Sequence, residues 1–193
     1  MDDMKKTDYR VEKDSIGVKD IPEEVYYGVQ TLRAAENFHI TGLNMHPEII
    51  NSLAYIKKAA AITNCEVGII DKKIANAIVK ACDEILEGKF HKDFIVDPIQ
   101  GGAGTSLNMN ANEVIANRGN EIAGKKLLHP NDDINKSQSS NDTFPTAMHI
   151  SAVIAMEDKL VPAVETLIAT FKRLEEENEG IVKSGRTHLQ DAT

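Results

Sequence analysis

The sequence contains no tryptophan, and its aromatic residues make up only 5% of 193 positions. β-sandwich and barrel cores usually draw on aromatic side chains. Here most of the apolar fraction consists of alanine, isoleucine, valine and leucine. This composition favours helices packed on helices over packed sheets, and the length suits one sizeable core or one domain with part of another.

Several partners and compartments are also disfavoured by what is missing. No basic run occurs and the formal net charge is −8, so we expect no nucleic-acid partner. No apolar run approaches the ~20 residues of a membrane span, and the polar start MDDMKKTDYR does not resemble a signal peptide. Cys65 and Cys82 form no CxxC pattern and are expected to be reduced. We therefore expect a cytoplasmic protein without a membrane partner.

Metal and cofactor motifs are likewise missing. The six histidines are scattered, and neither zinc-ligand spacing, HExxH, nor a catalytic triad occurs. The glycine-rich stretch at 101–106 has neither GxGxxG spacing nor a GK[ST] ending, so it is not a nucleotide motif. We expect no metal site and no cofactor.

Helical periodicity dominates the rest of the chain. Apolar spacing and stop signals predict one helix from about Pro47 to Glu66 and an antiparallel one from Asp71 to Gly88. A third helix should begin at Thr105 or Ser106, and residues 119–140, rich in Gly, Asn, Asp and Ser, should form a further loop. Near the N-terminus, residues 11–17 suggest an extended segment, and Pro22 with two following glutamates suggests a short helix or turn, followed by a loop through Gly42.

A long helix is predicted to start near Asn141–Asp142 with Pro145 in its first turn, and Pro162 predicts a kink or break. If continuous to Glu177, it would be on the order of 50 Å long. Such a helix cannot bury its apolar face on a small domain alone, which indicates a long bundle or an oligomer interface. The closing SGRTHLQDAT is predicted to be a polar loop.

Three polar loops carry the candidate chemistry. Residues 101–106 (GGAGTS) and 137–143 (SQSSNDT) each lead into a predicted helix, where backbone N–H groups and hydroxyls can bind an anion. Residues 185–190 (GRTHLQ) add a histidine capable of proton transfer. Taken singly, each has a simpler interpretation: a flexible loop, N-capping by Asn141 or Asp142, or a surface histidine.

The predicted third helix is unusual for its amides, which are Asn108, Asn110, Asn112, Asn117 and Asn120. Asparagine is a poor residue for a helix interior because its side chain competes for backbone hydrogen bonds. Either these amides serve specific polar packing at a site or interface, or they form a solvated face. The sequence alone leaves both interpretations open.

At these three loops, and across essentially the whole chain, the sequence resembles the aspartase/class II fumarase superfamily. The motifs occur in the family's order and spacing. YYGVQTLRAAENF and DPIQGGAGTSLNMNANEVIANR are similar to the aspartase branch, in which Ser106 follows the threonine where fumarases usually have glutamine. NKSQSSNDTFPTAMHI is at least as typical of fumarases.

The resemblance implies a mainly α fold: a small helical N-terminal domain over residues 1–140, then from 141–193 the first long helix of a central helical bundle. It implies reversible deamination of L-aspartate to fumarate and ammonia, in a homotetramer acting on a small molecule. Thr105, Ser139 and Ser140 match positions that bind the β-carboxylate. Asn141, Thr187 and His188 match positions that contact the amino group and α-carboxylate, with Thr187 and His188 as catalytic candidates.

Cβ proton abstraction would produce an aci-carboxylate dianion, which preorganised hydroxyl and amide donors stabilise. His129, Asn131 and Asp132, within HPND, match a secondary anion site of fumarase-like enzymes.

One departure from the family is large. The family's catalytic base is a serine in a loop reading GSSxMPxKxNP, and these 193 residues contain no such segment. We expect the chain to be a truncated N-terminal portion that is inactive alone, with a risk of non-native self-association through an exposed apolar stripe.

Three alternatives remain. A class II fumarase would add or remove water instead of ammonia. A non-catalytic superfamily member, as in some lens crystallins, would keep the fold without the reaction. A generic helical binding module would explain the composition but not the order of the motifs.

Overall fold

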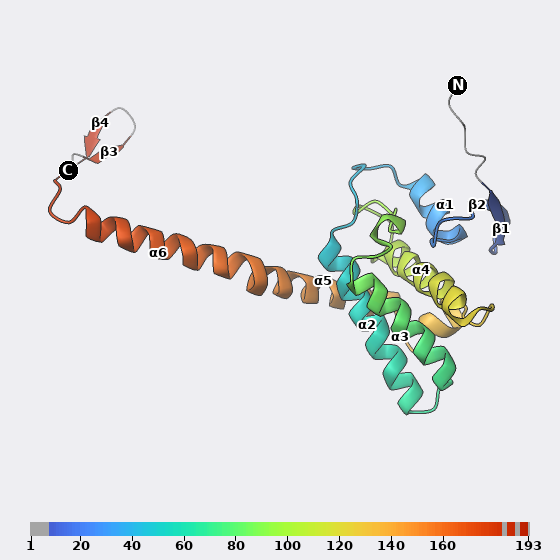
Figure 1. The fold of residues 1–193 in the computed structure, drawn as a ribbon. Helices are drawn as coiled ribbons and strands as arrows, with labels where there is room; N and C mark the ends of the chain where they lie inside the picture. Colours follow the sequence, from blue (N-terminus) through green and yellow to red (C-terminus); the bar gives the residue numbers. More distant parts are fainter. Residues whose placement is uncertain (1–7, 183–184, 188–189, 193) are drawn as a thin grey trace, which may run out of the picture. The chain divides into compact units, whose positions relative to one another are not determined.

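The computed structural model describes residues 8–182, 185–187 and 190–192. Its elements follow in chain order (Figure 1): β1 (Tyr9–Lys13), β2 (Val18–Pro22), α1 (Val29–Asn37), α2 (Pro47–Glu66), α3 (Lys72–Leu86), η1 (His91–Asp93), α4 (Thr105–Ala123), η2 (Pro130–Ile134), α5 (Ser140–Ala155), η3 (Met156–Leu160), α6 (Val161–Glu177), β3 (Gly185–Thr187) and β4 (Gln190–Ala192). The predicted mainly α fold is confirmed.

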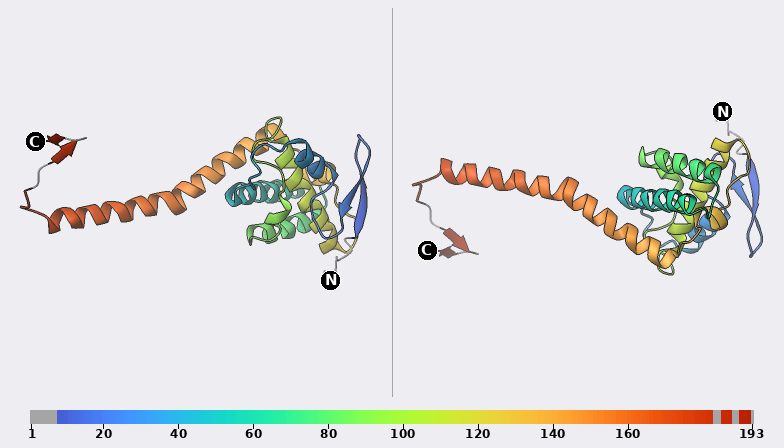
Figure 2. Two further views of the ribbon diagram at one scale, coloured as in Figure 1. Left: turned by 90° about the horizontal axis from the view of Figure 1, so that it is seen from above. Right: turned by 90° about the horizontal axis from the view of Figure 1, so that it is seen from below.

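The contacts divide the chain into two compact units, Met1–Ala152 and Val153–Thr193. In the first unit, α2 and α3 lie side by side and α4 packs on α3 (Figures 1 and 2). Fully buried side chains from these three helices, among them Leu53, Ile85 and Ile115, form its core. The predicted domain boundary between residues 140 and 141 stays a prediction.

The connection between α2 and α3 follows directly from one glycine. Gly68 has φ +76°, and the N–H groups of Gly68 and Ile69 donate to the carbonyls of Cys65 (3.1 Å) and Asn64 (2.8 Å). These bonds satisfy carbonyls at the end of α2 and stop the helix. Asp71 then precedes the first residue of α3, as predicted.

The N-terminal prediction needs correction. Pro22 ends strand β2, which pairs antiparallel with β1, and the first helix begins only at Val29. Proline is acceptable at this edge because β1 and β2 are the whole sheet. The sequence around Glu23 and Glu24 resembled a helix start, but Pro22 pairs with Tyr9 in the β1–β2 hairpin.

Two further predictions for loops were wrong in part. α4 continues to Ala123, and a π-turn (η2) lies within the segment that was predicted to be a loop from 119 to 140. The closing polar segment contains the β3–β4 hairpin.

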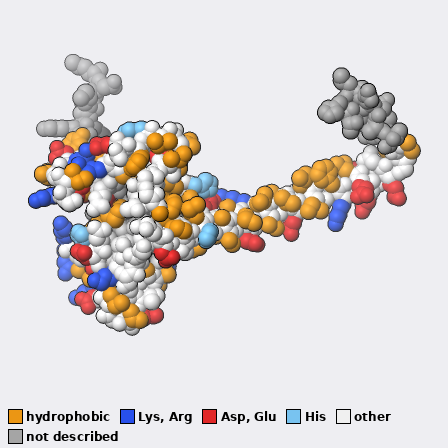
Figure 3. All heavy atoms as spheres, turned by 180° about the vertical axis from the view of Figure 1, so that it is seen from behind, with side chains coloured by type: hydrophobic (Ala, Val, Ile, Leu, Met, Phe, Trp, Pro, Cys, Tyr) orange, Lys and Arg blue, Asp and Glu red, His pale blue; other side chains and the backbone are white. Residues whose placement is uncertain are grey.

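In the second unit, the predicted break at Pro162 takes a specific form. Residues Met156–Leu160 are π-helical, and the Val161 N–H donates to the Met156 carbonyl five residues back. Pro162 lacks an N–H and its ring crowds the preceding turn, so a locally wider helix accommodates it. Large apolar side chains of α6 are exposed and gather along it (Figure 3): Val161, Val164, Leu167, Ile168, Phe171 and Leu174.

Candidate functional site

Thr105 follows the glycine-rich loop and is the first residue of α4. Gly104 precedes the helix with φ +76°, and the side chain of Thr105 is exposed. The amide of Gln100 fixes the loop, because its Oε1 accepts the Leu107 N–H (2.7 Å) and its Nε2 donates to the Asp97 carbonyl (3.0 Å). The first N–H groups of a helix have no intrahelical acceptor. Thr105 therefore lies where a small anion is favoured.

The serine-rich loop delivers a second set of donors at the start of α5. The Ser139 carbonyl accepts the N–H groups of Asp142 (3.1 Å) and Thr143 (2.9 Å) and the Thr143 hydroxyl (2.8 Å). Ser139 and Asn141 are exposed and Ser140 is half-buried. Asn141 and Asp142 lie inside the first turn, so capping by their side chains does not explain the cluster.

Pro145 lies deeper in α5 than predicted. Because α5 begins at Ser140, Pro145 is inside the helix rather than in its first turn. Proline has no N–H to offer the carbonyl four residues earlier, which belongs to Asn141. The Asn141 carbonyl is therefore left outside the helical ladder.

The two loops meet at a close contact. A Cβ added to Gly104 would lie 2.0 Å from Cγ of Phe144, in the first turns of α5. Likewise, a Cβ on Gly101 would lie 2.5 Å from Cζ of Phe38. Only glycine lets the loop lie this close to both rings. The structure thus brings the start of α4 beside the start of α5, as the predicted site requires.

The third loop belongs to the second unit. The backbone of Thr187 lies in β3, whereas His188 falls outside the described residues. The expectation that Thr187 and His188 join Thr105, Ser139, Ser140 and Asn141 stays a prediction.

The asparagines of α4 serve polar packing. Asn110 accepts the Ile95 N–H (3.0 Å) and donates to the Asp93 carbonyl (2.8 Å). Asn117 donates to the Tyr26 carbonyl (2.8 Å). The first of the two interpretations left open by the sequence therefore applies, since these amides bond to the backbone of loops far away in the chain.

Asn120 and Asn108 extend the pattern. Asn120 accepts the N–H groups of Leu127 and Leu128, both at 2.6 Å, and donates to the Leu128 carbonyl (3.0 Å). Asn108 is buried and donates to Oδ1 of Asn135 (3.0 Å). The last bond ties α4 to the segment that precedes the serine-rich loop.

A carboxylate holds the chain in front of the glycine-rich loop. Asp97 accepts the N–H groups of Thr41 (2.7 Å), Gly42 (2.9 Å) and Ile99 (2.8 Å). Burial alone would raise the pKa of Asp97, but these donors outweigh it and lower the pKa to about 2. Asp97 is therefore ionised at neutral pH and fixes both loop segments.

Sequence reasoning missed a second buried carboxylate. Glu113, only 4% exposed, accepts the N–H groups of Gly28 (2.8 Å), Gln30 (3.0 Å) and Thr31 (3.1 Å) at the N-terminus of α1. Glu12 accepts the Val29 N–H (2.9 Å) at the same helix end. The signal available in the sequence was a glutamate placed between Asn112 and Asn117 of α4. Burial raises the pKa of Glu113, and the three N–H donors oppose the rise.

Two of the three residues predicted for a secondary anion site share a pocket. A pocket of about 370 Å³ is lined by His129 and Asn131 together with residues that include Lys13 and Lys126, but Asp132 is not among them. Asp132 is exposed, and its N–H donates to Nδ1 of His129 (3.3 Å). The pocket also contains Glu12 and Glu113, whose charges oppose an anion. The secondary site stays a prediction.

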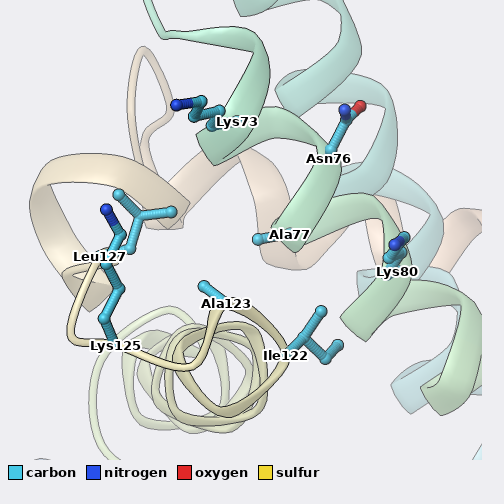
Figure 4. A pocket seen from close by; sticks show the side chains of 8 residues that line it. All are labelled: Lys73, Asn76, Ala77, Lys80, Ile122, Ala123, Lys125 and Leu127. Atoms are coloured by element: carbon cyan, nitrogen blue, oxygen red, sulfur yellow. The ribbon is translucent and has the colours of Figure 1, made fainter.

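A different pocket, of about 330 Å³, lies between α3 and the end of α4 (Figure 4). Lys73, Lys80 and Lys125 line it together with Asn76 and apolar side chains. None of the predicted site residues contributes to it. Its lysines surround the C-terminal end of α4, where cations complement the helix dipole, so this placement has a structural explanation.

Other predictions concern metals, thiols and membranes. In the described ranges, no three His, Cys, Asp or Glu side chains gather as a metal site would require. Cys65 and Cys82 are both free thiols, as expected. None of the described helices has the length and apolar character needed to cross a bilayer.

Comparisons with known proteins agree with this geometry. A family model described as lyase matches residues 17–193. The chain is 57% identical over 190 residues to an aspartate ammonia-lyase of Bacillus subtilis, covering 96% of the chain and 40% of that protein. It is 52% identical over 191 residues to a class II fumarate hydratase of Campylobacter jejuni, covering 96% and 41%.

The fold comparison gives the same result. A crystal structure of fumarate lyase:delta crystallin from Brucella melitensis in native form matches with a TM-score of 0.91 and 45% identity, covering 96% of the chain and 44% of that structure. The chain thus spans about two fifths of the length of the curated relatives it matches.

Proposed function

The chain belongs to the lyase family, and we propose that it forms the N-terminal part of an aspartate ammonia-lyase, which interconverts L-aspartate with fumarate and ammonia. One observation carries the proposal. Two donor loops at helix N-termini meet at Gly104 and Phe144 and leave Thr105, Ser139 and Asn141 accessible. This is an arrangement for a small carboxylate rather than for a nucleotide or a metal.

The proposed roles follow the charge that develops in the reaction. Removing a proton from Cβ of aspartate places a second negative charge on the β-carboxylate. Thr105, Ser139 and Ser140 donate hydrogen bonds to this aci-carboxylate, and the N-termini of α4 and α5 add partial positive charge. Asn141, Thr187 and His188 hold the amino group and the α-carboxylate. Ammonia then leaves from Cα, and the double bond of fumarate forms.

The catalytic base is not assigned to any residue of this chain. The family's base loop, GSSxMPxKxNP, does not occur in the sequence. We therefore propose that the 193-residue chain has no turnover alone, and that activity needs a longer protein, acting as a cytoplasmic homotetramer.

A class II fumarase is the second candidate. It is supported by the segment 135–150, which is at least as typical of fumarases, and by the 52% identity to the Campylobacter jejuni relative. The aspartase proposal is supported by the segments 26–38 and 97–118, including Ser106, which is half-buried beside Thr105.

The test uses the full reading frame that contains this chain. Fumarate formation is followed from L-aspartate and from L-malate in parallel. Preference for L-aspartate supports the proposal, and preference for L-malate replaces it with fumarase. Thr105→Val is expected to lower kcat/KM roughly 10²–10³-fold for the true substrate, as removal of one oxyanion donor does. Ser106→Gln tests whether this position contributes to the substrate preference. Lys72→Gln, at an exposed position of α3, is the control that should leave kcat/KM unchanged.

A further inference from the structure

A lysine is buried under the segment that leads into the serine-rich loop. Lys57, on α2, is 0% exposed and ranks among the largest fully buried side chains. Its Nζ donates to Oδ1 of Asn135 (3.1 Å) and to Oε1 of Gln138 (2.9 Å). It forms no ion pair with a carboxylate within the part of the chain that the structure describes. Burying an ammonium group among neutral partners is costly, so packing alone does not account for a lysine here.

The acceptor of this lysine is shared. Oδ1 of Asn135 also receives the side-chain amides of Asn108 (3.0 Å) and Asn112 (3.2 Å) from α4. Three donors from two helices therefore converge on one oxygen, and Lys57 also donates to the neighbouring Gln138. Because an ammonium group donates stronger hydrogen bonds than a neutral amide, Lys57 is the dominant contact of this cluster.

The same cluster shapes the backbone immediately before the donors. Nδ2 of Asn135 donates to the Gln138 carbonyl (3.1 Å), and Nε2 of Gln138 donates to the Ile134 carbonyl (2.8 Å). Between them, Ser137 has φ +58°, a left-handed conformation that a serine adopts only when its surroundings impose it. The next residue after Gln138 is Ser139.

We propose that Lys57 is a positioning residue: by donating to Asn135 and Gln138 it fixes segment 134–138, and so sets the place of Ser139, Ser140 and Asn141. The value of this positioning for a reaction rests on the proposed function. The positioning itself does not, since it concerns only contacts inside the first unit.

The charge of Lys57 makes the positioning sensitive to pH. Burial lowers the pKa of Lys57 to about 7. Burial raises the pKa of Cys82 on α3 to about 12, so it stays a neutral thiol across this range. The groups facing Lys57 from α4 and the loop, Asn108, Asn112, Asn135 and Gln138, are uncharged. Above neutral pH the ammonium becomes an amine with weaker donors, and the segment is held less firmly.

The first experiment measures backbone hydrogen exchange in the 193-residue chain. Lys57→Met is expected to speed exchange in residues 134–141 by about tenfold or more while leaving α3 unchanged. Lys57→Arg should restore part of the protection. Lys58→Met, a neighbouring residue whose ammonium pairs with Asp83 instead, is the matched control. Unchanged protection of residues 134–141 in Lys57→Met would overturn the proposal.

A second measurement needs no variant and covers the case in which Lys57→Met fails to fold. In the unaltered chain, exchange in residues 134–141 is recorded from pH 6 to 9 and corrected for intrinsic chemical rates. Protection should decrease as Lys57 loses its proton, with a midpoint near that of the Lys57 side-chain resonance. Protection that stays flat while the lysine resonance titrates in this range would contradict the assignment.

The complete protein separates this inference from the proposed function. For a positioning role, we expect an alkaline decline of kcat/KM beginning near pH 7 in the unaltered enzyme, and Lys57→Arg should lower kcat/KM for the preferred substrate and remove that decline. If exchange responds as expected but neither L-aspartate nor L-malate is converted, the proposed function fails and the positioning stands. If the substrate is converted but neither exchange nor the pH profile depends on Lys57, the positioning fails alone.

Discussion

Gly104 lies so close to Phe144 that a methyl group on the glycine would be 2.0 Å from Cγ of the ring. The glycine ends the loop before α4, and the phenylalanine belongs to the first turns of α5. This contact joins two segments about 40 residues apart in sequence that resemble parts of one substrate site. The addition of a single methyl group to Gly104 would therefore force this contact to change.

Gly104→Ala is therefore expected to destabilise the chain by about 2–4 kcal/mol, since it combines overpacking with a left-handed backbone. Urea unfolding followed by circular dichroism provides the measurement. Gly124→Ala is the matched control, because Gly124 also has positive φ but faces open space, and should cost only about 1 kcal/mol. An equal loss of unfolding free energy in both variants would show that the Phe144 ring moves away at little cost.

Glu113→Gln is expected to destabilise the first unit by roughly 2 kcal/mol. The carboxylate accepts three backbone N–H groups at the start of α1, whereas an amide presents one acceptor oxygen and turns a donor toward them. Glu66→Gln, at an exposed position, should change the free energy of unfolding by less than about 0.5 kcal/mol. A Glu113→Gln variant as stable as the control would mean that α1 does not depend on this contact.

The lowered pKa of Asp97 predicts that the folded chain loses stability in acid. Its pKa is about 2 in the folded chain against an ordinary value of 3.8, so the folded state binds the proton less readily. Its contribution to stability is present above about pH 4 and is lost as the pH falls toward 2. Asp97→Asn should be less stable at pH 7, and the difference should shrink between pH 4 and 2. Asp71→Asn, whose side chain makes no capping hydrogen bond, should leave this part of the profile unchanged.

The two thiols should differ in reactivity. Cys82 is 0% exposed and burial raises its pKa to about 12, whereas Cys65 is half-buried. At pH 8 a thiol reagent should modify Cys65 at least roughly a hundredfold faster, because Cys82 needs the core to open. A Cys65→Ser variant isolates Cys82, and urea should make it reactive. Rapid modification of Cys82 in the folded chain would contradict its placement.

Sequence reasoning was strongest where local signals coincide with burial. The bounds of α2, Pro47 to Glu66, were predicted from a proline at the start, apolar spacing and a following glycine. The start of α4 was predicted at Thr105 or Ser106 from the loop that precedes it, and the helix begins at Thr105. In both cases helix propensity, apolar periodicity and the Pro or Gly residues at the helix ends indicate the same boundary.

It failed where the deciding contact is remote. Pro22 has the same local surroundings at a helix start as at the end of a strand, and only pairing with Tyr9 decides between them. Glu113 was overlooked because its three donors lie more than 80 residues away. The sequence analysis did not single out Lys57, since nothing nearby in the sequence reveals its partners Asn135 and Gln138.

The asparagines of α4 restrict how this chain can change over evolution. Three of these amides bond to the backbone of other loops: Asn117 at Tyr26, Asn110 at Asp93 and Ile95, and Asn120 at Leu127 and Leu128. Side chains in those loops can be exchanged, but an inserted or deleted residue would move every later carbonyl and N–H away from its partner. Length variation should therefore accumulate at other connections, such as those at Gly68 and Gly88, where an added Cβ would meet no atom within 4 Å. The asparagines of α4 should therefore keep the lengths of these loops constant while the loop sequences diverge.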